Sequence, residues 1–206
     1  MITIIDYGMG NLRSVQKGFI KVGYPAEISG DPAKILAADG VVLPGVGAFG
    51  RCMENLDKYG LVETIKEFVN KDRPFLGICL GLQLLFDESE EFGPVRGLGI
   101  IPGKALRFPE SNGLKIPQMG WNVIEKVGDA PILRGVESGS FVYFVHSYYP
   151  SPDSPEDVYA VANYESDFCV ALGRDNLFAT QFHPEKSGHV GLDLLARFVA
   201  WDGKCQ

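Results

Sequence analysis

The residue best suited for chemistry is Cys79, which stands between two glycines in the segment PFLGICLGLQLL (74–85). Gly77 and Gly81 give the pattern G-x-C-x-G, where the strand-like run PFLGI (74–78) passes into a helix-like run. In many hydrolases a nucleophile framed in this way occupies a strained strand-to-helix turn and is exposed at the edge of a sheet. Glycine is needed there because larger side chains would collide with the turn and the neighbouring strand.

The position also favours a reactive thiol. A cysteine at the start of a helix faces the positive end of the helix dipole, which favours the thiolate. The backbone N–H of Leu80 would point to the place where an oxyanion forms. We therefore predict that Cys79 is an exposed nucleophile. The other cysteines, Cys52, Cys169 and Cys205, lack these neighbours and are predicted to be buried like small apolar residues.

A candidate base lies about a hundred residues downstream, in the segment Q-F-H-P-E. Proline restricts His183 to an extended conformation, in which residues two apart project to one face, so Glu185 should lie beside His183. A carboxylate in that place fixes the imidazole tautomer and stabilises the imidazolium, as in a nucleophile–base–acid triad. His146 and His189 have no such partner. We expect His146 to be a strand-end residue with its hydrogen-bonding groups fully satisfied and His189 to be a solvated residue at a helix start.

The glycine-rich loop from Gly45 to Gly50 matches G-x-G-x-x-G and follows the apolar run 40–44. A dinucleotide site needs a complete βαβ unit with an acidic residue closing its second strand. The residues after 44 are instead helical in pattern for about 25 positions. A tight strand-to-helix turn, or a loop that offers backbone N–H groups to another part of the site, are the stronger interpretations.

The elements that must position these residues alternate between strand and helix in the first half of the chain. Runs 2–6, 40–44 and 74–78 are predicted strands, and 12–22, 51–58, 61–70 and 190–201 are predicted helices, the first capped by Asn11. The strand-like runs of the second half are 103–108, 121–127, 140–149, 158–164, 169–174 and 177–182. We predict an α/β fold in which residues 1–206 form a single-domain three-layer sandwich. Its central sheet is mixed and largely parallel, extended by the strands of the second half.

Composition excludes several classes of function. The net charge of −7 and pI near 5.0, with no Lys/Arg cluster, argue against nucleic-acid binding. No leader and no apolar stretch near the ~20 residues of a membrane span are present, so we expect a soluble cytoplasmic protein. The cysteines form no C-x-x-C pair, and neither a metal nor a cofactor is predicted.

Taken together, G-I-C-L-G-L-Q-L-L and F-H-P-E resemble the class I (triad) glutamine amidotransferases. Four more stretches, at 44–49, 118–122, 143–148 and 182–187, resemble the branch that supplies ammonia in histidine biosynthesis. The resemblance covers essentially the whole chain. The branch that serves pyridoxal phosphate synthesis is the alternative, although it lacks P-G-V-G and M-G-W-N. A different thiol hydrolase and a non-catalytic regulatory domain also stay open.

This resemblance implies a role for each matching position. Cys79 would be the nucleophile, His183 the general base and acid, and Glu185 the orienting carboxylate. The oxyanion hole would be formed by Val46, Gly47 and Leu80, in a loop where a peptide flip can be required. The substrate glutamine would be held by Gly45, Gly47, Gln83, Glu91, Ser147 and Tyr148. For Glu91 a solvated acidic loop is an equal alternative.

The resemblance further implies a heterodimer with a (β/α)8-barrel cyclase that receives the ammonia. Four residues match positions that face this partner, namely Asn11, Trp121, Tyr143 and Lys186. Simpler interpretations are a helix cap for Asn11, core aromatics for Trp121 and Tyr143, and a surface cation for Lys186.

Overall fold

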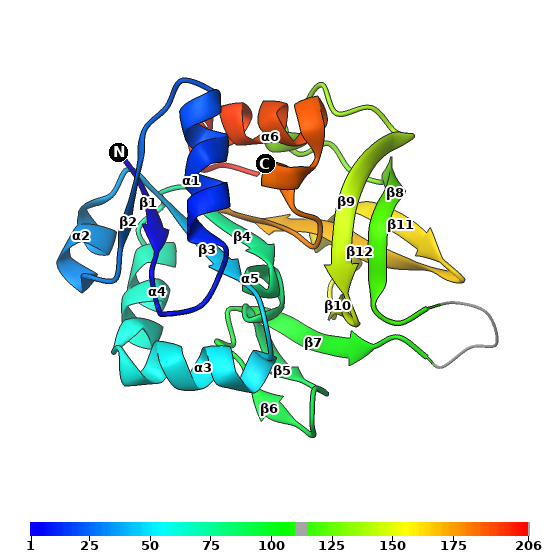
Figure 1. Ribbon diagram of the computed structural model, residues 1–206, viewed down its shortest axis with the longest axis horizontal. Helices are drawn as coiled ribbons and strands as arrows, with labels where there is room; N and C mark the ends of the chain where they lie inside the picture. Colours follow the sequence, from blue (N-terminus) through cyan, green and yellow to red (C-terminus); the bar gives the residue numbers. More distant parts are fainter. Residues whose placement is uncertain (110–114, 206) are drawn as a thin grey trace.

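The protein, described by a computed structural model for residues 1–109 and 115–205, is built on a 9-stranded sheet of order β2-β1-β3-β4-β13-β12-β11-β8-β9 (Figure 1). The parallel half contains β2 (Ala26–Ser29), β1 (Ile2–Ile5), β3 (Gly40–Gly45), β4 (Phe75–Cys79) and β13 (Leu177–Thr180). The antiparallel half contains β12 (Ser166–Arg174), β11 (Val158–Tyr164), β8 (Gln118–Lys126) and β9 (Ser140–His146). The predicted α/β class with a mixed sheet is confirmed.

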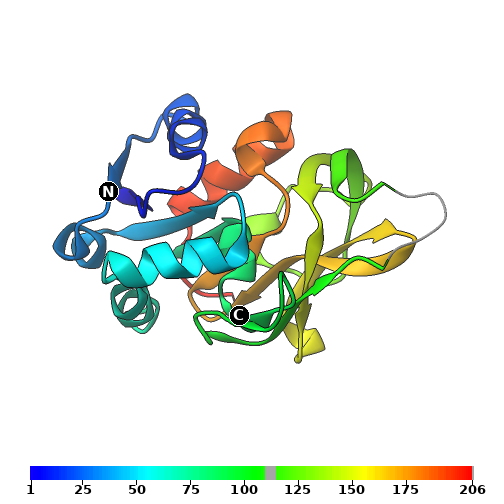
Figure 2. The same ribbon diagram turned by 60° about the horizontal axis from the view of Figure 1, so that its bottom comes forward.

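Helices cover both faces of the parallel half, as the apolar strands there require. One layer holds α1 (Leu12–Lys21) and α6 (Gly188–Ala200), and the other holds α2 (Pro32–Ala37), α3 (Phe49–Lys58) and α4 (Leu61–Val69) (Figure 2). Phe19 of α1 meets Phe198 of α6 with ring centroids 6.2 Å apart, within one core. Phe68 of α4 packs on Phe75 of β4 in the other. The three-layer arrangement is confirmed.

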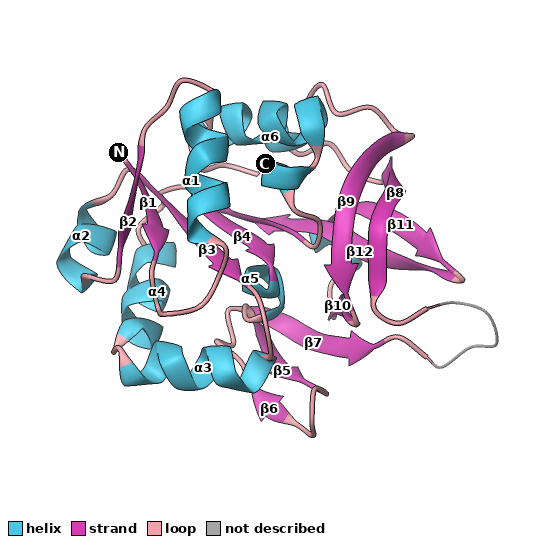
Figure 3. Ribbon diagram, viewed as in Figure 1, coloured by secondary structure: helices cyan, strands magenta, loops and turns pink. Residues whose placement is uncertain are grey.

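A second, smaller sheet lies beside this sandwich, and its strands are coloured magenta in Figure 3. Its order is β10-β7-β5-β6, with β10 (Tyr148–Pro152), β7 (Ile101–Arg107), β5 (Phe86–Ser89) and β6 (Val95–Arg96). The prediction that all strands of the second half extend one sheet is therefore wrong for β7 and β10. Run 140–149 is also divided at Ser147 between the two sheets. Apolar periodicity identifies a strand but does not say with which neighbour it pairs.

The predicted helices all occur, with ends shifted by a few residues. Asn11 is at the N-cap of α1, but its side chain makes no capping hydrogen bond, so that part of the prediction is wrong. A short strand and helix, β2 and α2, were not predicted. Asp31 caps α2 by accepting from the N–H of Ala33 at 2.9 Å, and Pro32 occupies the first turn. No helix among the described residues is long and apolar enough to cross a bilayer.

Candidate active site

Cys79 is the last residue of β4, and α5 (Leu80–Gln83) starts directly after it. Its backbone has φ +55° and ψ −111°, a sparsely populated conformation for a non-glycine residue that costs on the order of 1–3 kcal/mol. β4 lies between β3 and β13, at the centre of the parallel half. The carboxyl edge of such a sheet is where ligands bind in open α/β folds. The helix is much shorter than the apolar run indicated, because the chain turns into β5 after Leu85.

The two glycines around Cys79 are required by its neighbours. A Cβ atom at Gly81 would lie 1.9 Å from the carbonyl oxygen of Leu43 in β3. One at Gly77 would lie 3.0 Å from the Cβ of Ala179 in β13. Strand packing on both sides of β4 therefore explains the G-x-C-x-G pattern, as predicted from the turn.

A pocket of about 260 Å³ opens above the turn. It is lined by Val46, Gly47, Cys79, Leu80, Gln83, Glu91, Pro117, Val145, His146, Ser147, Tyr148 and His183. Cys79 is only 6% exposed, so the expectation of an exposed thiol is wrong in that sense: the thiol lies on the wall of a pocket. The other three cysteines are buried as predicted, and all four are free thiols.

His183 and Glu185 form a buried pair beside the thiol. The His183 Nδ1–H donates to Glu185 Oε1 at 2.8 Å, while His183 Nε2 has no hydrogen-bond partner within residues 1–109 and 115–205. Burial alone would lower the pKa of His183, but interactions with Cys79 and Glu185 outweigh burial and raise this pKa to about 9. The backbone N–H of His183 donates to the Tyr143 carbonyl at 3.0 Å, which fixes the segment beside β9. Nε2 is thus left free to exchange a proton with the thiol or a ligand.

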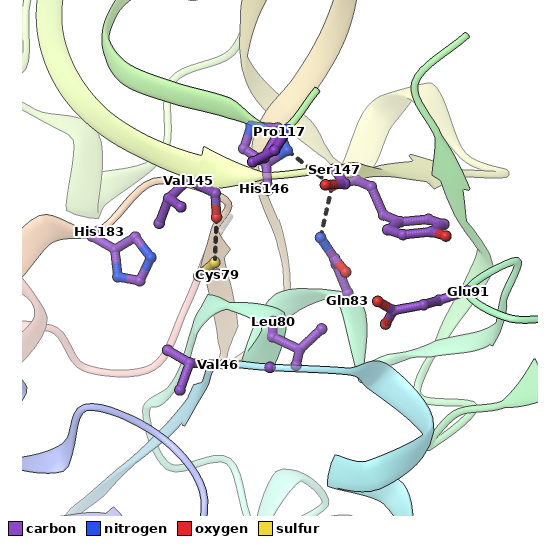
Figure 4. A pocket seen from close by; sticks show the side chains of 12 residues that line it. Val46, Cys79, Leu80, Gln83, Glu91, Pro117, Val145, His146, Ser147 and His183 are labelled. Carbon is purple, nitrogen blue, oxygen red and sulfur yellow. Dashed lines mark hydrogen bonds between the residues drawn. The ribbon is translucent and has the colours of Figure 1, made fainter. Parts of the chain in front are cut away.

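Figure 4 shows Cys79 between His183 and Gln83. The thiol lies 3.9 Å from the Val145 carbonyl oxygen and 3.6 Å from Gln181 Nε2. Gln83 Nε2 donates to Tyr148 O at 2.8 Å and to Gln181 Oε1 at 2.9 Å.

The sequence prediction missed Gln181, Val145 and Pro117. Gln181 lies two residues before His183, but the chain bends at 181 and 182, so the alternation of an extended segment would not have pointed to it.

His146 was predicted to be fully hydrogen-bonded, which is wrong. Its Nδ1–H donates to Tyr148 O at 2.9 Å, but its buried Nε2 has no hydrogen-bond partner in the part of the chain that the structure describes. Burial lowers the pKa of His146 to about 4, so the ring is neutral at physiological pH. It packs against Phe108, Phe144 and Phe168. His189 is exposed at the start of α6, as predicted.

The glycine-rich loop forms another wall of the pocket. Within residues 1–109 and 115–205, the N–H groups of Val46 and Gly47 donate to no protein acceptor. Gly47 has φ +98°, and a Cβ at Gly45 would lie 2.9 Å from the N atom of Gly81. The loop therefore presents unused amides beside the thiol.

Glu91 is not a solvated loop residue. It lines the pocket, and its Oε2 accepts from the Phe49 N–H at 2.5 Å.

Three of the four predicted partner-facing residues are neighbours. Trp121 of β8 pairs with Tyr143 of β9, their ring centroids 6.2 Å apart, and Lys186 Nζ lies 5.6 Å from the Tyr143 ring centroid. The simpler interpretation of Trp121 as a core aromatic is wrong, because it is 56% exposed. Asn11 is exposed and has no hydrogen bond or ring contact with the other three. Among the described residues no cluster of His, Cys, Asp and Glu is arranged to hold a metal.

Comparison with known proteins agrees with this geometry. The family model described as glutamine amidotransferase class-I matches residues 3–200. The imidazole glycerol phosphate synthase subunit HisH of Syntrophotalea carbinolica is 59% identical, covering 96% of this chain and 98% of that protein. The HisH of Geobacter sulfurreducens is 54% identical, covering 96% and 97%. The structure of PurLQS from Thermotoga maritima superposes with a TM-score of 0.75 at 16% identity, covering 97% of each chain. The chain belongs to the class-I glutamine amidotransferase family, in the branch of the HisH subunits of imidazole glycerol phosphate synthase.

Proposed function

We propose that this amidotransferase releases ammonia from glutamine with Cys79, His183 and Glu185 as its catalytic triad. The observation that carries the proposal is that Cys79 and His183 line one pocket and that His183 Nε2 has no hydrogen-bond partner among the described residues. Sulfur attacks the side-chain carbonyl carbon, and the C=O electrons move to oxygen to give a tetrahedral oxyanion. Collapse of this intermediate breaks the C–N bond. His183 gives its proton to the leaving nitrogen, and a thioester remains.

His183 first donates a proton and later accepts one. With its pKa about 9, the ring carries the proton that the leaving amine needs at neutral pH. After ammonia departs, the neutral ring takes a proton from water, which attacks the thioester and releases glutamate. Glu185 holds Nδ1 throughout, so that Nε2 is the nitrogen that exchanges protons.

The oxyanion would be stabilised by N–H groups of Leu80, Val46 and Gly47, and each such donor is typically worth about 10²–10³ in rate. Glutamine would be held by Gly45, Gly47, Gln83, Glu91, Ser147 and Tyr148. Gln83 uses its amide N–H groups within the protein, so its oxygen is left to accept from the ligand. The Glu91 carboxylate suits the α-ammonium group of glutamine.

We further propose that a (β/α)8-barrel cyclase binds this chain in a heterodimer and consumes the ammonia in histidine biosynthesis. The relatives are named as subunits of a synthase, which supports a partner. An apolar surface on β8 and β9 supports its place: Met119, Trp121 and Phe141 are 66%, 56% and 59% exposed. Tyr143 connects this surface to the site, its ring centroid 6.5 Å from that of His183. A direct handover is needed because ammonia released into water is protonated and loses its nucleophilicity.

Two further features belong to the same proposal. Residues 1–206 act as a single domain, supported by a sheet that runs through both halves of the chain. The protein works in the cytoplasm, where four free thiols stay reduced.

The test is glutamate release from glutamine, measured for the chain alone and with the cyclase encoded in the same genome plus the cyclase's nucleotide ligand. We expect weak activity alone and a strong rise in the complex. A peptidase or esterase activity without glutamine hydrolysis would instead indicate a different thiol hydrolase. No activity with any partner would indicate a regulatory domain.

The docking surface has its own control. Trp121→Ala should weaken cyclase binding by about 10-fold or more, as expected of a large aromatic at an interface. Phe92 is 92% exposed in the turn between β5 and β6, so Phe92→Ala should leave binding unchanged. Equal effects of the two variants would contradict the proposed surface.

A further inference from the structure

Two buried side chains that do not line the pocket hold the loop 44–47. The Tyr7 hydroxyl donates to the carbonyl oxygen of Pro44 at 2.8 Å, and the Cys52 thiol donates to that of Val46 at 3.7 Å. The Tyr7 hydroxyl also lies within donating distance of the Cys52 sulfur, at 3.6 Å. The topology brings them together, because Tyr7 follows β1, the neighbour of β3, and Cys52 lies in the first turn of α3.

Both groups are suited to be permanent donors. Tyr7 and Cys52 are fully buried. Burial, together with Cys52, raises the pKa of Tyr7 well above its ordinary value, and burial likewise raises the pKa of Cys52. Each therefore keeps its single proton at neutral pH, and the two protons serve two carbonyl oxygens. Neither group contacts the pocket, and the triad chemistry uses neither.

These contacts fix the direction of the loop amides. The C=O and N–H of a trans peptide point to opposite sides. With the Val46 carbonyl turned toward Cys52 in the core, the Gly47 N–H faces the other way, and Gly47 lines the pocket. Gly45 lies close to the elbow, because a Cβ atom added there would be 2.9 Å from the N atom of Gly81, so the elbow and the Tyr7–Cys52 pair both restrain the loop.

We propose that Tyr7 and Cys52 are positioning residues that hold the oxyanion loop so that the Gly47 N–H faces the reacting carbonyl. The peptide between Gly45 and Val46 receives neither contact and is the one left free to rotate. This inference rests on the proposed glutaminase function, and it adds two residues outside the triad and the glutamine pocket to the machinery.

The first test does not depend on activity. The Gly45 and Gly47 N–H groups belong to the two peptides whose carbonyl oxygens Tyr7 and Cys52 hold. Amide ¹⁵N relaxation of the free chain should give Gly45 and Gly47 order parameters near those of rigid backbone, about 0.85. In Tyr7→Phe, which removes one oxygen, and in Cys52→Ala, we expect these values to fall toward about 0.6. Unchanged values in both variants would overturn the proposal.

The second test is the kinetics of glutamine hydrolysis in the complex with the cyclase. A misdirected oxyanion donor should lower kcat by about 10- to 100-fold with little change in KM. The double variant should lose little more than the worse single variant, because both residues hold one loop. A normal kcat, or a raised KM with normal kcat, would contradict the positioning role.

Matched controls separate this role from general destabilisation. Cys169→Ala removes a buried thiol that also contacts a carbonyl oxygen at 3.7 Å, and Tyr164→Phe removes a hydroxyl that donates to the Lys115 carbonyl at 2.7 Å. Both controls should keep wild-type kcat. If the wild-type complex releases no glutamate, the proposed function fails, while the order parameters still decide whether Tyr7 and Cys52 hold the loop.

Discussion

His183 Nδ1 lies 2.8 Å from Glu185 Oε1, and the two side chains expose only 2% and 1% of their surfaces. Solvent screens an ion pair this deeply buried only weakly. Because both side chains are almost fully buried, the loss of one partner leaves the other unsatisfied. Burial by itself would lower the pKa of His183 and favour the neutral ring, whereas Cys79 and Glu185 raise this pKa to about 9. The pair therefore keeps His183 protonated at neutral pH, as the proposed reaction requires.

Replacement of Glu185 should weaken both activity and stability. Glu185→Gln should lower kcat by about 10²–10⁴-fold, because the imidazolium loses its support. The folded-state pKa of His183 lies above its ordinary 6.5, so protonated His183 stabilises the fold fully below pH 6.5 and progressively less as pH rises through about 9. The difference in unfolding free energy between wild type and variant, about 1–3 kcal/mol at low pH, should shrink across that window. Denaturant unfolding across the window checks this; a pH-independent difference would contradict it.

Removal of single thiols should show that Cys79, unlike the other buried cysteines, is required for activity. Cys79→Ala should reduce glutamate release by about 10⁴-fold or more, as loss of a nucleophile does in other triad enzymes. Cys169→Ala, at a thiol whose pKa burial raises to about 12, should remain nearly as active as wild type. Steady-state assays of the two variants in the complex check the assignment, and equal losses would refute it.

His146 should make the protein sensitive to acid. The folded state keeps this ring neutral down to a pKa of about 4, while the unfolded chain takes up the proton near 6.5. Stability should therefore be lost as pH falls from 6.5 to about 4, by about 3 kcal/mol. His146→Asn keeps a donor for the Tyr148 carbonyl but cannot titrate, so its stability should decline less in this range. Exposed His189→Asn is the control and should follow wild type.

The elbow should not tolerate a methyl group. Gly81→Ala would place Cβ 1.9 Å from the Leu43 carbonyl oxygen, so α5 and β3 must move apart, at a cost of about 3 kcal/mol. At Gly50, in α3, the nearest atom is a Val95 methyl at 3.7 Å. Gly50→Ala should be neutral or stabilise the protein by up to about 1 kcal/mol. Thermal unfolding of both variants checks this, and similar melting temperatures would be inconsistent with the steric argument.

Much of the fold was predictable from the sequence because its signals are local. Helices such as α1 and α6 have apolar residues at helical spacing, and the buried strands β1, β3 and β4 are short apolar runs between turns. Glycines at 77 and 81 indicated a strand-to-helix turn around Cys79. Proline at 184 restricted His183 to the extended conformation that the structure shows. The prediction that the extended segment continues through Glu185 is wrong, because Glu185 lies in a 3-10 helix, Pro184–Lys186, from which it reaches His183. Each inference needed only a few consecutive residues.

Contacts between distant segments were decided by the tertiary structure. Pairing of β7 with β10 rather than with the large sheet, the approach of Gln181 to Cys79, and the unpaired Nε2 of His146 depend on sheet order. The sequence by itself determined which side chains could do chemistry and which local turns would present them. Only the fold decided that the thiol lies within a pocket rather than at an open edge, and that Tyr7 reaches Pro44. Hydrophobic periodicity is a local property, whereas the register and order of strands are set by packing across the whole sheet.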